Sequence, residues 1–201
     1  MTVAEQAAKA DVIADGVVVK IDTRTLEDGF VVTLLRLQVT DVLRGTVPSR
    51  TLTLGLPGAQ IGGVWVGVDD IPTVKLGDEL VVFGSAVNAN DVAMLGATQS
   101  VFRKVHGKGG DIAADFDGNP LIDPGCTEDR LIARPADQAP VGEVGQRTEN
   151  GPIDVTPKDR VFLADPESAA LPWPVFLTNL KVCIDSQPAS AGATSVLGGG
   201  W

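Results

Sequence analysis

The sequence lacks most of the side chains from which enzyme and metal sites are built. Its 201 residues include one histidine, two cysteines and no tyrosine. Zinc fingers and zinc-dependent proteases need more histidine or cysteine ligands than this chain contains. A serine triad would have to use His106 as its base, yet no Gly-x-Ser-x-Gly segment accompanies it. We therefore expect no catalytic residues, no cofactor and no metal.

Positive charge is also scarce. The chain carries 16 Lys and Arg against 26 Asp and Glu, which gives a net charge of −10. Such a surface repels phosphate backbones and anionic lipid, so nucleic acid and membrane surfaces are disfavoured as partners. No apolar run is long enough to span a bilayer, and Met1–Glu5 lacks the basic and apolar regions of a signal peptide. We expect either a cytoplasmic protein or a mature exported chain.

What the sequence does contain is a turn-rich pattern of β-strands, with 23 glycines and 13 prolines. Residues 11–22 and 30–43 have the pattern of two long strands, and Asp28-Gly29 between them is a strong hairpin signal. Ile13, Val17, Val19 and Ile21 alternate along the first strand. Gly16 interrupts this strand, which predicts a β-bulge or a sharp bend. A strand bent in this way can serve two sheets, as a small barrel requires.

The second strand has two faces of different character. Its odd positions are mostly apolar, whereas its even positions begin apolar and become polar from Arg36 onward. One face is therefore expected to be buried throughout, and the other only around Phe30, Val32 and Leu34. We expect the N-terminal helix or the C-terminal segment to cover that first half. Further strands are expected within residues 51–56, 76–83, 92–95 and 100–105.

The two ends of the chain differ from this β-rich part. Thr2 and Glu5 fit a capping box, which predicts a short helix through Lys9. From residue 126 onward, prolines and glycines interrupt the sequence, which predicts an irregular arm that packs in part on the barrel. Cys126 and Cys183 lie in this arm and could form one disulfide, which would contribute about 4 kcal/mol in the chain-entropy model. Two buried thiols are the alternative.

A cluster of acids offers the strongest alternative site. The stretch Asp111–Asp123 carries five side chains with oxygen ligands, namely Asp111, Asp115, Asp117, Asn119 and Asp123. Such groups suit Ca²⁺, and paired carboxylates suit hydrolysis. An EF-hand that began at Asp115 would need Glu where Cys126 stands. Turn formation by Asp and Asn is the plainer interpretation, with a carboxylate- or Ca-dependent hydrolase-type site as the alternative.

The most basic run is Phe102–Lys108. On a small barrel it could form a nucleic-acid-binding strand, with Phe102 stacking on a base. The net charge and the lack of further interleaved aromatic residues favour a solvated strand face instead. The glycines at Gly107–Gly110 lack the spacing of a phosphate loop, so this stretch is predicted to be a β-turn.

Several segments, in order along the chain, allow a comparison with a known family. They resemble an uncharacterised group of bacterial exported domains, whose pattern runs Ala-Asp-x-Val-x-x-Gly-x-Val, Val-Leu-Lys/Arg-Gly, Pro-Gly-Gly and Gly-Glu-x-x-Leu-x-Phe-Leu. The resemblance covers about Val3–Asp123 and departs from the pattern at Ala59, where the family has a second glycine. The matching segments are Ala10–Val18, Val39–Gly45, Leu56–Gly58 with Gly62-Gly63, and Leu76–Phe83.

The resemblance implies an OB-like barrel, related in architecture to netrin/TIMP-like inhibitor barrels, in a group that sometimes accompanies secreted metalloproteases. It also implies a location outside the cytoplasm, where a disulfide would persist. Inhibitors of the TIMP type place an N-terminal cysteine on the protease zinc. This chain has no such cysteine, so inhibition of the TIMP type is not implied here. It also has no His-Glu-x-x-His segment, so protease activity is not implied either.

The sequence therefore predicts a mainly β protein. Residues 1–125 are expected to form an OB-like small antiparallel β-barrel with a short N-terminal helix, and residues 126–201 the irregular arm. The predicted function is a non-enzymatic exported binding module for an unknown protein or extracellular ligand, without membrane insertion. Trp65, in the Gly-rich stretch 58–68, and Trp173 are the predicted partner contacts. An OB-type binder of single-stranded nucleic acid is a second alternative, which the net charge disfavours.

Overall fold

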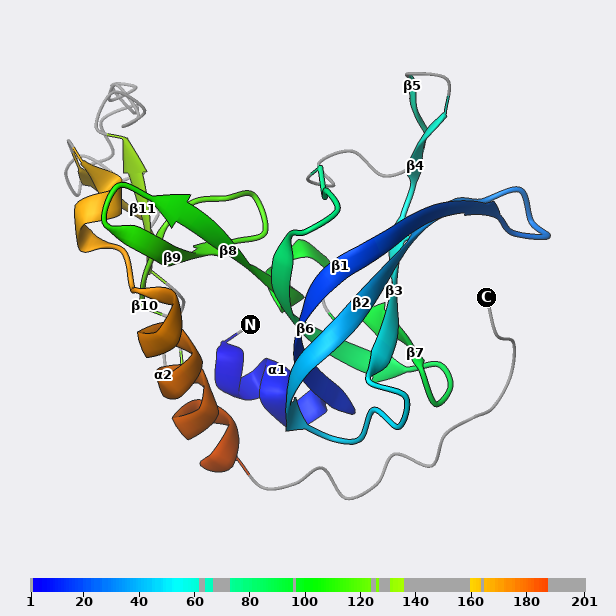
Figure 1. The fold of residues 1–201 in the computed structure, drawn as a ribbon, viewed down its shortest axis with the longest axis horizontal. Coiled ribbons are helices and arrows are strands. Elements are labelled where there is room, and N and C mark those ends of the chain that lie inside the picture. The colour runs from blue at the N-terminus through cyan, green and yellow to red at the C-terminus, as the bar shows by residue number, and fades with distance from the viewer. Residues whose placement is uncertain are drawn as a thin grey trace, which may run out of the picture.

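The computed structural model shows a β-barrel with two helices packed beside it (Figure 1). The helices are α1 (Val3–Lys9) and α2 (Trp173–Asp185). As predicted, Thr2 and Glu5 form a capping box at the start of α1. The structure describes residues 2–61, 64–66, 73–95, 97–123, 126, 131–135, 160–163 and 165–187.

Five strands close the barrel in the order β1-β2-β3-β7-β6, with β6 pairing back onto β1. Neighbouring strands are antiparallel except β3 and β7, which run parallel. This closed arrangement is an OB-like barrel, as the sequence predicted, and closure removes the free edges where the strands pair around the ring. The barrel strands are β1 (Val12–Thr25), β2 (Val31–Arg44), β3 (Thr51–Pro57), β6 (Glu79–Ala86) and β7 (Asp91–Met94).

Shorter elements extend from the barrel. β8 pairs with β6 and then with β9, which lengthens the sheet beyond the barrel wall. β4 and β5 form a hairpin within the Gly-rich stretch, and β10, β11 and β12 form a three-stranded sheet. The bounds are β4 (Ala59–Ile61), β5 (Val64–Val66), β8 (Val101–Gly107), β9 (Gly110–Asp115), β10 (Leu121–Asp123), β11 (Leu131–Pro135) and β12 (Arg160–Leu163), with 3-10 turns η1 (Ala97–Ser100) and η3 (Pro166–Ala169).

The pairing of β1 with β2 has three irregularities. The register shifts between Ile13 and Ala14, between Asp15 and Gly16, and between Val18 and Lys20. Gly16 therefore lies at a bulge, as predicted. A Cβ at Gly16 would lie 2.9 Å from the main-chain oxygen of Gln38, so a larger residue would push β2 away. The bend lets the first half of β1 pair with both β2 and β6.

β6 separates two hydrophobic cores. Leu80 and Val82 face the barrel interior, which is filled by aliphatic side chains from all the barrel strands and by Phe116. Val81 and Phe83 face the other way, into a second core that includes α1, α2, β8 and β9. A strand buried on both faces needs a continuous apolar run, which explains why these four residues do not alternate.

The arm predicted to be irregular contains the 13-residue helix α2. The prolines that suggested irregular structure stand at the helix start, with Pro172 as the N-cap and Pro174 in the first turn. Proline is tolerated there because its missing N–H would have no partner within the helix. The buried face of α2 packs in the second core through Trp173, Phe176, Leu180, Cys183 and Ile184.

Arg44 links both helices to the end of β2. Its guanidinium donates to the carbonyl oxygen of Ala7 in α1 and to those of Ile184 and Gln187 at the end of α2, the last at 3.2 Å. The final carbonyls of a helix lack partners within the helix and carry partial negative charge, so a guanidinium satisfies both needs. Gly45, which follows, lets the chain pass against the backbone of Asp11.

Replacing Gly45 with alanine should destabilise the fold more than replacing Gly29. Both glycines have left-handed φ, +79° and +83°, so alanine pays about 1–2 kcal/mol of backbone strain at either position. A Cβ at Gly45 would also overlap the main-chain oxygen of Asp11, whereas at Gly29 it meets nothing within 4 Å. Urea denaturation should show Gly45→Ala to be less stable than Gly29→Ala by about 1–3 kcal/mol. Equal losses would contradict the close approach at Gly45.

Candidate functional site

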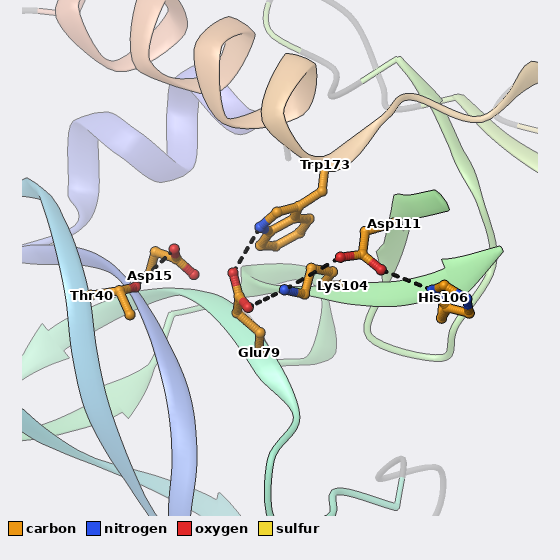
Figure 2. Close-up of polar contacts among 7 residues, drawn as sticks. All are labelled: Asp15, Thr40, Glu79, Lys104, His106, Asp111 and Trp173. Carbon is orange, nitrogen blue, oxygen red and sulfur yellow. Dashed lines mark hydrogen bonds and ion pairs between the residues drawn. The ribbon is translucent and has the colours of Figure 1, made fainter. Parts of the chain in front are cut away.

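A chain of polar side chains connects α2 with β6, β8 and β9 (Figure 2). At its centre, the Glu79 carboxylate accepts a hydrogen bond of 2.9 Å from the indole N–H of Trp173 and pairs with the ammonium of Lys104. Lys104 also lies 3.6 Å from Asp111, whose carboxylate lies 3.1 Å from Nδ1 of His106. This series of polar contacts thus runs from the buried indole of Trp173 to the exposed imidazole of His106.

The ammonium of Lys104 lies between two carboxylates of this network, those of Glu79 and Asp111. The hydrogen bond to Glu79 raises the pKa of Lys104, and the hydrogen bond with His106 lowers the pKa of Asp111. Both shifts favour the charged forms at neutral pH. A general acid or base works best with a pKa near the working pH, and these two pKa values move away from it. The arrangement therefore has the properties of a structural ion-pair network.

Asp15 is a buried acid near this chain that the sequence did not single out as a site. Its side chain lies on β1, between β2 and β6, and only 5% of the residue is exposed. One carboxylate oxygen accepts a 2.9 Å hydrogen bond from the Thr40 hydroxyl. Burial raises the pKa of Asp15 from 3.8 to about 6, while the bond from Thr40 opposes that rise. Asp15 therefore titrates in a range where most carboxyls are fully charged.

Two acids of the predicted cluster at Asp111–Asp123 lie at opposite ends of β9. Asp111 and Asp115 are about 13 Å apart, because a strand rises about 3.3 Å per residue. The carboxylate of Asp115 accepts hydrogen bonds of 2.8 and 2.9 Å from the backbone and side-chain amides of Asn119, which closes a turn. Within the described ranges, no three His, Cys, Asp or Glu side chains are grouped closely enough to hold a metal ion.

The two tryptophans predicted as partner contacts have different positions. Trp173 is only 4% exposed and stacks on Phe176 with ring centroids 5.3 Å apart. It belongs to the second core, so the prediction for Trp173 is corrected: burial leaves almost no surface for a partner. The backbone of Trp65 pairs with Gln60 in the β4–β5 hairpin. The side chain of Trp65 lies outside the described part, and its contact role stays a prediction.

Cys126 and Cys183 form a disulfide, which was one of the two predicted alternatives. Their Cα atoms lie 5.5 Å apart, and the bond joins the chain beyond β10 to α2. Cys183 is buried in the second core, so the bond fastens the helix at its packed face. Disulfides form and persist in oxidising compartments. Neither α1 nor α2, the helices within the described ranges, is long and apolar enough to cross a membrane.

A hollow of about 510 Å³ lies on the outer face of the barrel sheet. Strand register explains its position, because one row of paired residues crosses four strands. Lys20 of β1 pairs with Arg36 of β2, Arg36 with Thr53 of β3, and Thr53 with Asp91 of β7. The rest of the lining comes from Asp22, Thr23, Arg24 and Leu34.

Two of the three cations in this hollow have no protein partner among the described residues. Lys20 pairs with Asp22 at 2.6 Å. Arg24 and Arg36, in contrast, make neither a hydrogen bond nor an ion pair with any part of the chain that the structure describes. A guanidinium offers five donors in a planar fork that matches a carboxylate or a phosphate. With Lys20, Arg24 and Arg36 against Asp22 and Asp91, the hollow carries a small positive excess on a protein of net charge −10.

Comparison with known proteins gives no family for this chain. It matches no protein-family model and no curated protein. The resemblance to exported OB-like domains therefore stays a prediction from the sequence motifs.

Asp15→Asn should stabilise the protein at neutral pH but not in acid. Because the folded pKa of about 6 lies above the ordinary 3.8, the folded state binds a proton that the unfolded chain has released between these pH values. Stability therefore falls as pH rises through that window, and an uncharged asparagine removes the loss. Circular-dichroism melting should show the variant about 3–6 °C above the wild type at neutral pH and nearly equal to it near pH 4. Parallel pH profiles would contradict this account of Asp15.

Removing the disulfide should destabilise the fold. The bond closes a loop with a sequence separation of 57, so the double variant Cys126→Ser, Cys183→Ser should lose about 2–4 kcal/mol of unfolding free energy. Reductant should lower the melting temperature of the wild type to that of the double variant and leave the variant unchanged. An unchanged melting temperature, with opening of the bond verified by thiol titration, would refute a stabilising role.

Proposed function

We propose that the protein is a non-enzymatic extracytoplasmic binding module that recognises its partner through the outer face of β1, β2 and β3. One observation carries the proposal: the hollow on this face contains Arg24 and Arg36, which have no protein partner among the described residues. Charged groups that serve structure are normally paired, as Lys20 is with Asp22. Unpaired cations that line a concave surface instead favour binding of a ligand.

The non-enzymatic part of the proposal is supported by the polar chain around Glu79. Its side chains bind one another. The carboxylate of Glu79 accepts a hydrogen bond from Trp173 and pairs with Lys104, and the carboxylate of Asp111 contacts His106 and Lys104. A lysine, a carboxylate or an imidazole can act as a nucleophile, but here Lys104 is paired with both carboxylates, and Asp111 also contacts His106. A binding role for the protein needs nothing more from this network than to position α2 on the barrel.

The extracytoplasmic part is supported by the disulfide between Cys126 and Cys183. Such bonds are rare in reducing compartments and common in exported domains. The acidic net charge agrees with this location, since it keeps an exported module soluble and away from anionic surfaces.

Site-specific photo-crosslinking tests the proposal. A benzophenone side chain placed at Thr23, an exposed residue at the rim of the hollow, should capture a partner from envelope or culture fractions. The matched control places the same group at Val182, which is 66% exposed on α2, and should give no such product. Adding Arg36→Glu to the Thr23 probe should abolish the capture. Capture of the same product from both positions, or no product from Thr23, would rule out this face as the binding surface.

A further inference from the structure

Arg24 and Arg36 stand at the two ends of one outward-facing row of side chains. In the β1–β2 register Arg36 lies opposite Lys20, and Arg24 lies opposite Val32. Positions 20 and 24 are four residues apart on β1, so the two arginines are separated by about 13 Å along the strand direction. With their backbone positions this far apart, each guanidinium can hold a separate anionic group.

An apolar side chain lies between the two cations. Leu34 occupies the position opposite Asp22, midway between the arginine positions, and it lines the hollow. Asp22 itself is engaged by Lys20 at 2.6 Å. Along the direction of the strands, a cation (Arg36), an aliphatic side chain (Leu34) and a second cation (Arg24) therefore follow one another at every second position.

An extended peptide has the same spacing. Residues i, i+2 and i+4 of a strand point to one side and span about 13 Å. Acidic residues at i and i+4 would thus reach Arg36 and Arg24, while an aliphatic residue at i+2 would rest on Leu34. A guanidinium pairs with a carboxylate through two parallel hydrogen bonds, which gives both strength and direction to the contact.

We propose that the hollow binds an extended acidic peptide segment of a partner protein, with carboxylates at i and i+4 on Arg36 and Arg24. The inference depends on the proposed function and adds the chemistry of the ligand. The volume of about 510 Å³ suits a short segment. Single-stranded nucleic acid fits less well, because the lining includes no aromatic residue on which a base could stack.

Fluorescence anisotropy with labelled ten-residue peptides tests the inference. The probe has Glu at i and i+4 and Leu at i+2 in a Ser/Thr background, and its control has Gln at both acidic positions. The Glu peptide should bind at least about tenfold more tightly, and Arg24→Glu and Arg36→Glu should each weaken it about tenfold. Lys181→Glu, an equal charge change at an exposed position of α2, should bind as the wild type does. Melting curves of the variants verify their folding.

Equal affinity for the Glu and Gln peptides would overturn the inference, as would undiminished binding to either arginine variant. Arginine-dependent binding of a single-stranded oligonucleotide, with no binding of the Glu peptide, would assign the hollow to nucleic acid and contradict it. If crosslinking from Thr23 succeeds while the peptides fail, the ligand chemistry is wrong and the binding function stands. If both fail, the proposed function fails as well.

Discussion

The bend of β1 at Gly16 is the constraint on which the structure depends. Because this residue has no side chain, β1 can approach the backbone of Gln38 closely enough to pair with β2 on one edge and β6 on the other. The pairing with β6 ends at Val17, while the pairing with β2 continues to Thr25. The second half of the hairpin therefore runs on beyond the closure, where Figure 1 shows β1 and β2 extending together to their turn.

This geometry divides the molecule into a packed side and an open side. On the packed side, each face of β6 contributes side chains to a different core. The disulfide holds α2 in place there, and a hydrogen bond from Arg44 holds α1. The polar chain around Glu79 belongs to that side, since it joins α2 to the strands. On the open side, the outward positions of β1, β2 and β3 line the hollow. The helix-packed side and the side with the hollow thus use mostly different strands of the barrel.

Much of the fold could be predicted because its signals are local. The hairpin at Asp28-Gly29, the bulge at Gly16 and the capping box of Thr2 each need only a few neighbouring residues.

The helix α2 was missed because Pro172 and Pro174 obscured the helical spacing of its buried residues, although proline is common in a first turn. The alternation of Val17, Val19 and Ile21 predicted one shared face, but the irregularity between Val18 and Lys20 leaves Val19 half exposed. The hollow could not be predicted, because the row Lys20, Arg36, Thr53, Asp91 exists only through register across four strands.

The central claim is that the working surface is the open face of the barrel and not the polar chain near α2. A two-dimensional amide NMR titration with the partner captured by crosslinking, or with its acidic segment, tests this claim most directly. The account predicts shift changes concentrated at residues 20–24, 34–36 and 53, which form the hollow. Changes concentrated at Lys104, His106 and Asp111, with the hollow unaffected, would contradict it.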